Sequence, residues 1–158
     1  MPDATPHHGI PPFILGMTRS QALVAVGQPD KAETNDWGAG TFETWSYESM
    51  QVTVTFDEEE SWRMNSITLK GPANTIKGSS LIGCEADALA LLAADAGIPD
   101  VRQTDDFEES GRCHESELFD LQFWEAEGRI VNVTLFPQYE EGGNVPRWPA
   151  ASQETPDN

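Results

Sequence analysis

The chain contains the same kind of segment twice, and this repetition is the strongest constraint on its fold. ILGMTRSQALVAVGQPD occupies residues 14–30, and LIGCEADALALLAADAGIPD occupies residues 81–100. Both segments run from a glycine through an apolar stretch to Gly-x-Pro-Asp. Internal similarity of this kind is typical of a duplicated structural unit. We therefore expect each copy to open one half of the chain.

The first copy carries the signals of a short helix with a defined start and end. Thr18 is a favourable N-cap residue, and Gln21 follows it at the spacing of a capping box. Gly27 suits a left-handed residue after the helix, and Pro29 prevents the helix from continuing. The second copy predicts a helix that is about three residues longer, because its apolar stretch is longer by that amount.

The residues after the first helix alternate in the manner of half-buried strands. In MQVTVTF, residues 50–56, every second side chain is apolar, which predicts an antiparallel strand with one buried face. Its expected partner strands are FETWSY at 42–47 and WRMNSITLK at 62–70. An acidic turn at 57–61 connects it to the second of these strands. Residues 31–41, KAETNDWGAGT, are rich in turn-forming residues and predict a loop.

The second half is expected to repeat this order. GRCHES at 111–116 is the candidate first strand, ELFDLQFW at 117–124 is the second, and NVTL at 132–135 corresponds to SITL at 66–69. The inward positions of the middle strands are expected to correspond pairwise, Val52, Val54 and Phe56 with Phe119, Leu121 and Phe123.

These patterns predict an α+β fold of two tandem helix-plus-antiparallel-meander modules. Joined edge to edge, the modules form one curved antiparallel sheet with helices on one face and water on the other. The expected organisation is a flexible N-terminal arm, a first module, a second module and a C-terminal tail, at residues 1–13, 14–70, 81–136 and 137–158.

Three stretches of the first half resemble a known family. GMTRSQALVAVGQPD at 16–30, WSY at 45–47 and VTVTF at 52–56 resemble the SmpA/OmlA-type module. Two such modules in tandem resemble the architecture of the β-lactamase inhibitor proteins. The resemblance implies a sheet that binds another protein on its open face, as in an inhibitor or a polymorphic-toxin immunity protein. The first half lacks the cysteines of the disulfide that this inhibitor type carries in each module.

Net charge is the most pronounced bulk property. The chain has 27 acidic and 9 basic residues, a formal net charge of −18. Such a chain repels nucleic acid and anionic membranes, and it attracts basic proteins. The alternative is that the acidic residues serve only solubility or adaptation to a salt-rich host. This alternative predicts that they are spread evenly along the chain, whereas here they gather in the two acidic segments 57–60 and 105–109.

The sequence contains no set of residues at catalytic spacing. His7 and His8 lie in the expected N-terminal arm. Cys113 and His114 are adjacent, so on a strand they point to opposite faces and form no nucleophile–base pair. We therefore expect no enzyme activity, no cofactor and no metal site. Cys113 and Cys84 are expected to be free thiols, with a disulfide between them as the alternative.

The candidate partner-binding residues come from the open sheet face, the acidic segments and two tryptophans near turns. Trp37 either packs back on the core or serves as an exposed anchor, and Trp62 has the same two options. The open face is expected to carry Gln51, Thr53 and Thr55 in the first half, and Asp120, Gln122 and Trp124 in the second. The candidate set is Trp37, Asp57, Glu58, Glu59, Glu60, Trp62, Asp105, Asp106, Glu108, Glu109, Asp120, Gln122 and Trp124.

These features favour a protein inhibitor in the cytoplasm. The first residues, MPDATPHHGIPPFILG, show no basic n-region and no apolar h-region, so no signal peptide is expected. The leading hypothesis is an immunity protein that occludes the active site of a cognate basic toxin. The free chain is then a monomer and the complex a 1:1 heterodimer. The alternatives are an assembly or scaffold module of the outer-membrane-lipoprotein type and a DNA-mimic regulator.

Overall fold

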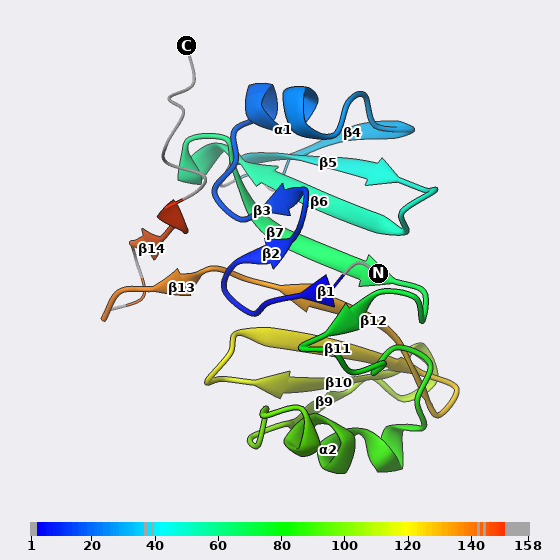
Figure 1. Ribbon diagram of the computed structural model, residues 1–158. Coiled ribbons are helices and arrows are strands. Elements are labelled where there is room, and N and C mark those ends of the chain that lie inside the picture. Colours follow the sequence, from blue (N-terminus) through cyan, green and yellow to red (C-terminus); the bar gives the residue numbers. More distant parts are fainter. Residues whose placement is uncertain (1–2, 37, 39, 142, 144, 151–158) are drawn as a thin grey trace.

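One eight-stranded antiparallel sheet forms the centre of the molecule (Figure 1). The computed structural model describes residues 3–36, 38, 40–141, 143 and 145–150. The strand order is β4-β5-β6-β7-β12-β11-β10-β9. The strands are β4 Lys31–Asp36, β5 Thr41–Tyr47, β6 Val52–Asp57, β7 Arg63–Lys70, β9 Arg102–Asp106, β10 Arg112–Ser116, β11 Leu121–Ala126 and β12 Arg129–Leu135.

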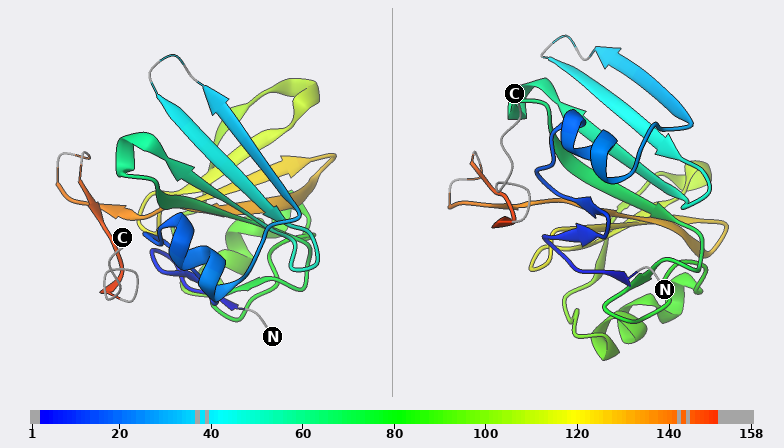
Figure 2. Two further views of the ribbon diagram at one scale, coloured as in Figure 1. Left: turned by 90° about the horizontal axis from the view of Figure 1, so that it is seen from above. Right: turned by 45° about the horizontal axis from the view of Figure 1, so that its top comes forward.

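Helices and short strands complete the fold. The described part of the chain has α1 Arg19–Ala25 and α2 Ala86–Asp95, and neither is long and apolar enough to cross a membrane. Both α-helices lie on the same side of the sheet, while the outer hairpins β4–β5 and β9–β10 bend away from that side (Figure 2). The shorter elements are β1 Asp3–Ala4, β2 Gly9–Ile10, β3 Phe13–Ile14, η1 Glu58–Glu60, β8 Thr75–Ile76, η2 Glu108–Ser110, β13 Gln138–Tyr139 and β14 Pro146–Arg147.

The predicted α+β fold of two helix-plus-meander modules is wrong. Of the described residues, 46% lie in strands and 17% in helices. Eight of the strands form one antiparallel sheet, and there are only two α-helices in the described part of the chain. The unpredicted strands β4 and β9 are the two edges of this sheet. All of β4 is exposed, as is β9 apart from Thr104, so neither shows the apolar alternation that reveals a strand. The predicted loop 31–41 therefore starts with an edge strand.

The N-terminal residues are part of the packed structure. Asp3 and Ala4 pair in parallel with Thr75 and Ile76, and β2 pairs with β3. Phe13 is 1% exposed, and its ring meets that of Tyr47 at a centroid distance of 5.1 Å. The described residues of the expected loose arm thus cover part of the sheet.

The local signals for α1 and its neighbouring strands are confirmed. Gln21 N–H donates to Thr18 Oγ1 at 3.2 Å, and Thr18 N–H donates to Gln21 Oε1 at 2.9 Å, which completes the predicted capping box. Gly27 has a φ of 98°, the left-handed conformation expected there. Of the residues predicted to point inward, Val52, Val54, Phe56, Leu121 and Phe123 are buried, whereas Phe119 is half-buried in the turn before β11.

The two halves of the chain meet at the pairing of β7 with β12. Thr68 lies directly opposite Thr134, and their hydroxyl oxygens are 2.8 Å apart. On the other face, Leu69 is paired with Val133, and both are fully buried. One continuous sheet therefore places side chains from both halves on the same surfaces.

The aspartate of each Gly-x-Pro-Asp segment holds a strand-connecting turn in place. Asp30 Oδ2 accepts a hydrogen bond from Glu48 N–H at 2.7 Å, in the connection between β5 and β6. Asp100 accepts from Leu118 N–H at 2.9 Å and from the Ser116 hydroxyl at 2.6 Å, in the connection between β10 and β11. Burial raises the pKa of Asp100, but these hydrogen bonds outweigh burial, and its pKa lies below the usual value.

Replacing Asp100 with asparagine should therefore weaken the fold in a pH-dependent way. A lowered carboxyl pKa stabilises the folded state above the unfolded pKa of about 4, and this stabilisation is lost as pH falls through the folded value. We expect Asp100→Asn to lower the free energy of unfolding by about 1 kcal/mol at pH 7, with the difference shrinking as pH falls through the folded pKa of Asp100. Urea denaturation across this range measures it, with exposed Asp95→Asn as the control. A difference that is constant with pH contradicts the assignment.

Candidate functional site

The face of the sheet away from the helices is lined mainly by small polar side chains. Half-buried hydroxyl residues run across its middle: Thr44, Ser46, Thr53, Thr55, Ser66, Thr68 and Thr134. They are opposite one another in the strand register, as in the pairs Thr44–Thr55 and Thr53–Thr68. We call this surface the open face. At β11 it also carries Gln122 and Trp124.

At the β11–β10 end, the open face contains a hollow of about 440 Å³. Trp124 on β11 and Phe107 after β9 form its aromatic walls, with ring centroids 5.6 Å apart. Phe107 is 53% exposed, whereas Cys113 on β10 is 2% exposed. The residues that line this aromatic hollow are Asp105, Phe107, Ser110, Cys113, Gln122 and Trp124.

The connection that carries Phe107 has a defined backbone. Asp106 Oδ1 accepts from Glu108 N–H at 2.9 Å, and Phe107 N–H donates to Gly111 C=O at 2.8 Å. Asp106 Oδ2 also accepts from Arg112 Nε at 3.1 Å. The hydrogen bond from Glu108 N–H, followed by the one from Arg112, lowers the pKa of Asp106. These hydrogen bonds therefore fix the backbone position of Phe107 in the turn.

A buried carboxylate supports this turn from the covered side of the sheet. Glu125 is only 4% exposed, and its Oε1 is 2.8 Å from His114 Nε2. Its Oε2 accepts from Arg112 Nη1 at 3.1 Å, and Arg112 in turn holds Asp106. The guanidinium between these two carboxylates has a raised pKa because both accept its hydrogen bonds. Glu125, His114 and Arg112 form what we call the charge network.

The structure brings together three predicted binding residues and shows why others were missed. Asp105, Gln122 and Trp124 line the aromatic hollow, and Asp106, Glu108 and Glu109 lie in the adjoining strand end and turn. Phe107, Ser110 and Cys113 were not predicted. Phe107 occurs within the acidic segment 105–109, where its aromatic ring among carboxylates was the available signal.

The other acidic segment lies far from the hollow along the strands. Because β7 and β12 are antiparallel neighbours, the turn after β6 and the hairpin β9–β10 are at opposite ends of the sheet. In that turn, Asp57 Oδ1 accepts from Glu59 N–H, and Glu58 begins η1. Glu60 accepts from the Tyr139 hydroxyl at 3.0 Å, and burial together with Glu60 raises the pKa of Tyr139. The carboxylates of Asp57 and Glu60 therefore serve the local structure here.

Four further predicted residues lie away from the hollow or outside the described residues. Trp62 is half-buried and packs on the core, and the Arg19 guanidinium lies 4.3 Å from its ring centroid. Asp120 is in the turn before β11, not on the strand, and its Oδ2 is 2.8 Å from His7 Nε2. Gln51 likewise has a φ of 55° in a turn. Trp37 is outside the described residues.

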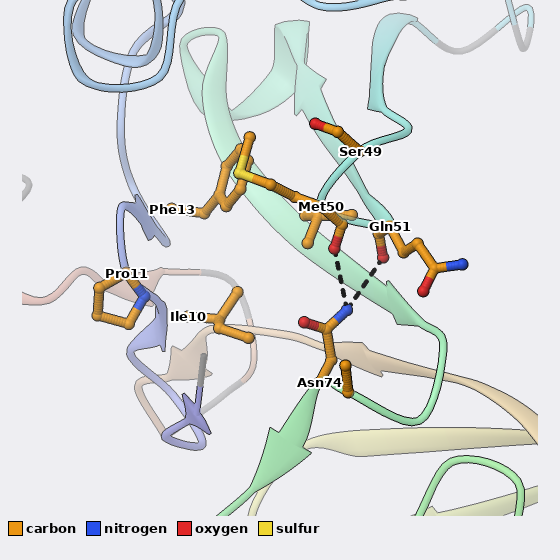
Figure 3. A pocket seen from close by; sticks show the side chains of 9 residues that line it. Ile10, Pro11, Phe13, Ser49, Met50, Gln51 and Asn74 are labelled. Atoms are coloured by element: carbon orange, nitrogen blue, oxygen red, sulfur yellow. Dashed lines mark hydrogen bonds between the residues drawn. The ribbon is translucent and has the colours of Figure 1, made fainter. Parts of the chain in front are cut away.

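A second hollow, of about 210 Å³, lies between the N-terminal segment and the connection from β5 to β6 (Figure 3). Ile10, Phe13 and Met50 give it apolar walls. Asn74, which is 3% exposed, donates from Nδ2 to the carbonyls of Met50 and Gln51 at 3.1 and 3.3 Å. Its lining has no ionisable side chain, so apolar contact is the interaction it offers.

Metal-ligating and thiol groups do not gather into a site in the described ranges. No group of three or more His, Cys, Asp or Glu side chains there is placed to hold a metal ion. Cys84 and Cys113 are free thiols, as predicted. Burial raises the pKa of Cys84, which lowers its reactivity at neutral pH.

Comparison with known proteins returns no relative. No protein-family model, no curated protein and no solved structure matches this chain. Its function is therefore inferred from its own residues.

Proposed function

We propose that this chain is a cytoplasmic immunity protein, which neutralises a basic toxin by covering its active site. The observation that supports this most directly is the aromatic hollow, with two adjacent rings on a sheet face that neither helix covers. Aromatic side chains supply much of the binding energy in protein interfaces, especially where polar groups surround them. The Asp105 carboxylate lines the hollow together with these rings, and three further carboxylates belong to the same acidic segment 105–109.

Charge favours a basic protein as the partner. The chain carries a net charge of −18, and four of the five residues in 105–109 are acidic. Such a surface accelerates encounter with a positively charged protein and repels nucleic acid. A toxin that acts on a polyanion has a basic active site, and an acidic protein is complementary to it.

Co-expression tests this proposal. Each gene that flanks the gene of this chain is expressed in a sensitive host, alone and together with the chain. We expect one neighbour to arrest growth and the chain to restore it. Phe107→Ala should weaken the complex by about 2 kcal/mol, or about 30-fold in Kd, because it removes an exposed ring. Leu91→Ala, on the 70% exposed outer side of α2, is the matched control.

The salt dependence of association separates this function from the alternatives. A charge-steered inhibitor loses association rate steeply between about 0.05 and 0.5 M salt, since screening shortens the range of attraction. An apolar assembly contact changes little over the same range. Absence of rescue with every neighbour, or rescue that Phe107→Ala and Leu91→Ala impair equally, contradicts the proposal.

A further inference from the structure

We infer that the aromatic hollow receives an arginine side chain of the basic partner; this deepens the proposed function and rests on it. The rings of Trp124 and Phe107 line the hollow with their centroids 5.6 Å apart, and aromatic rings suit the planar guanidinium and its alkyl stem. Cys113 and three polar groups complete the lining: the Asp105 carboxylate, the Gln122 amide and the Ser110 hydroxyl. The site thus combines an apolar surface for stacking with acceptors for N–H groups.

Carboxylates without an ion-pair partner at and beside the hollow favour a cation as its ligand. In the described part of the chain, no ion pair is found for the side chains of Asp105, Glu108 and Glu109. The nearest bases along the sequence are Arg102 and Arg112. Arg102 is paired with Glu117, and Arg112 is paired with Asp106 and Glu125. An apolar side chain entering the hollow would desolvate Asp105 without compensation, and an anion would be repelled.

The first half of the chain already contains a tryptophan ring and a carboxylate that together hold an arginine of this chain. The Arg19 guanidinium carbon lies 4.3 Å from the centroid of the Trp62 ring, and Arg19 Nη1 is 3.5 Å from Glu43 Oε2. An arginine that stacks on tryptophan and pairs with a carboxylate is therefore a stable arrangement in this protein. At the aromatic hollow, the tryptophan and carboxylate are present and a partner supplies the arginine.

Arginine is favoured over lysine by the shape of the site. Guanidinium is planar, stacks on aromatic rings and pairs with a carboxylate through two N–H groups. The ammonium group of lysine is compact and strongly hydrated, so it gains less from the rings. The hollow in Figure 3 has apolar walls but no carboxylate, and it does not meet these requirements.

The inference is tested with short peptides on the full chain. The probes are acetyl-Gly-Arg-Gly-amide, the same peptide with citrulline, and the same peptide with lysine. The indole N–H resonance of Trp124, assigned by its absence in Trp124→Phe, reports occupancy by NMR. We expect a saturable shift with a millimolar Kd for the arginine peptide, at least threefold weaker binding of the lysine peptide, and no saturation with citrulline.

Charge variants decide between a specific site and general attraction to an acidic protein. Asp105→Asn should weaken the arginine peptide at least threefold, while Asp95→Asn on α2, with the same change in charge, should leave Kd unaltered. Equal effects of the two variants, or equal binding of citrulline, overturn the inference. The measurement needs no toxin, so the two proposals fail separately. Growth rescue without arginine binding contradicts only the hollow's role, and arginine binding without rescue contradicts only the immunity function.

Discussion

Replacement of Glu125 with alanine should lower the free energy of unfolding by about 2–4 kcal/mol. The carboxylate is almost fully buried and satisfies His114 on one oxygen and Arg112 on the other. The variant leaves the largely buried imidazole without this partner and opens a void at the end of β11. Urea denaturation at pH 7 gives the difference directly, and a mutant within 0.5 kcal/mol of the native chain contradicts the prediction.

Two further variants show whether the effect comes from the charge network. Glu117 is 77% exposed at its side chain and pairs with Arg102 at 2.9 Å, so Glu117→Ala should change stability by less than about 0.5 kcal/mol. A double-mutant cycle of Glu125→Ala with His114→Ala should give a coupling energy of about 1 kcal/mol or more, since the two side chains are in direct contact. Additive losses would show that packing alone accounts for the effect.

The sequence predicted those parts of the fold in which capping residues or buried apolar residues recur at a regular spacing. The capping box at Thr18 and the alternation of Val52, Val54 and Phe56 both followed from local rules. The edge strands β4 and β9 followed no such rule, because their stability comes from hydrogen bonds to one neighbour while their side chains meet water. The short strands β2 and β3 also lack an alternating apolar pattern, because the buried residues Ile10 and Phe13 occur among prolines.

The charge network was missed because of an error in register of two residues. Phe119 was aligned with Val52, but β11 begins at Leu121, so Leu121, Phe123 and Glu125 follow the inward positions of the strand. A charged residue at an inward position breaks the apolar alternation, so the sequence pattern favours Phe119 over Glu125 as an inward residue. Asp120 was consequently placed on the open face, whereas it lies in the turn. Gln122 and Trp124 were placed on the correct face in either register.

Gly111→Ala should destabilise the chain by about 3 kcal/mol or more and should disrupt the aromatic hollow. Gly111 has φ 127° and ψ −169°, a backbone conformation that is essentially restricted to glycine. A Cβ atom there would lie 2.2 Å from the Glu125 carbonyl oxygen and 3.0 Å from the Trp124 ring. The strand ends must separate to admit the methyl group, and Phe107, whose N–H is bonded to the Gly111 carbonyl, must move with them.

Gly128→Ala is the control that measures the cost of a positive φ without a steric clash. Gly128 also has a positive φ, of 79°, but no atom lies within 4 Å of the position of an added Cβ. We expect it to lose only about 1–2 kcal/mol, the cost of a left-handed alanine. Urea denaturation compares the two variants, and the Trp124 indole resonance shows whether the hollow survives in each. Equal losses of stability would mean that Gly111 is required only for its φ, and an unchanged Trp124 resonance in Gly111→Ala would mean that the hollow does not depend on the approach of these strands.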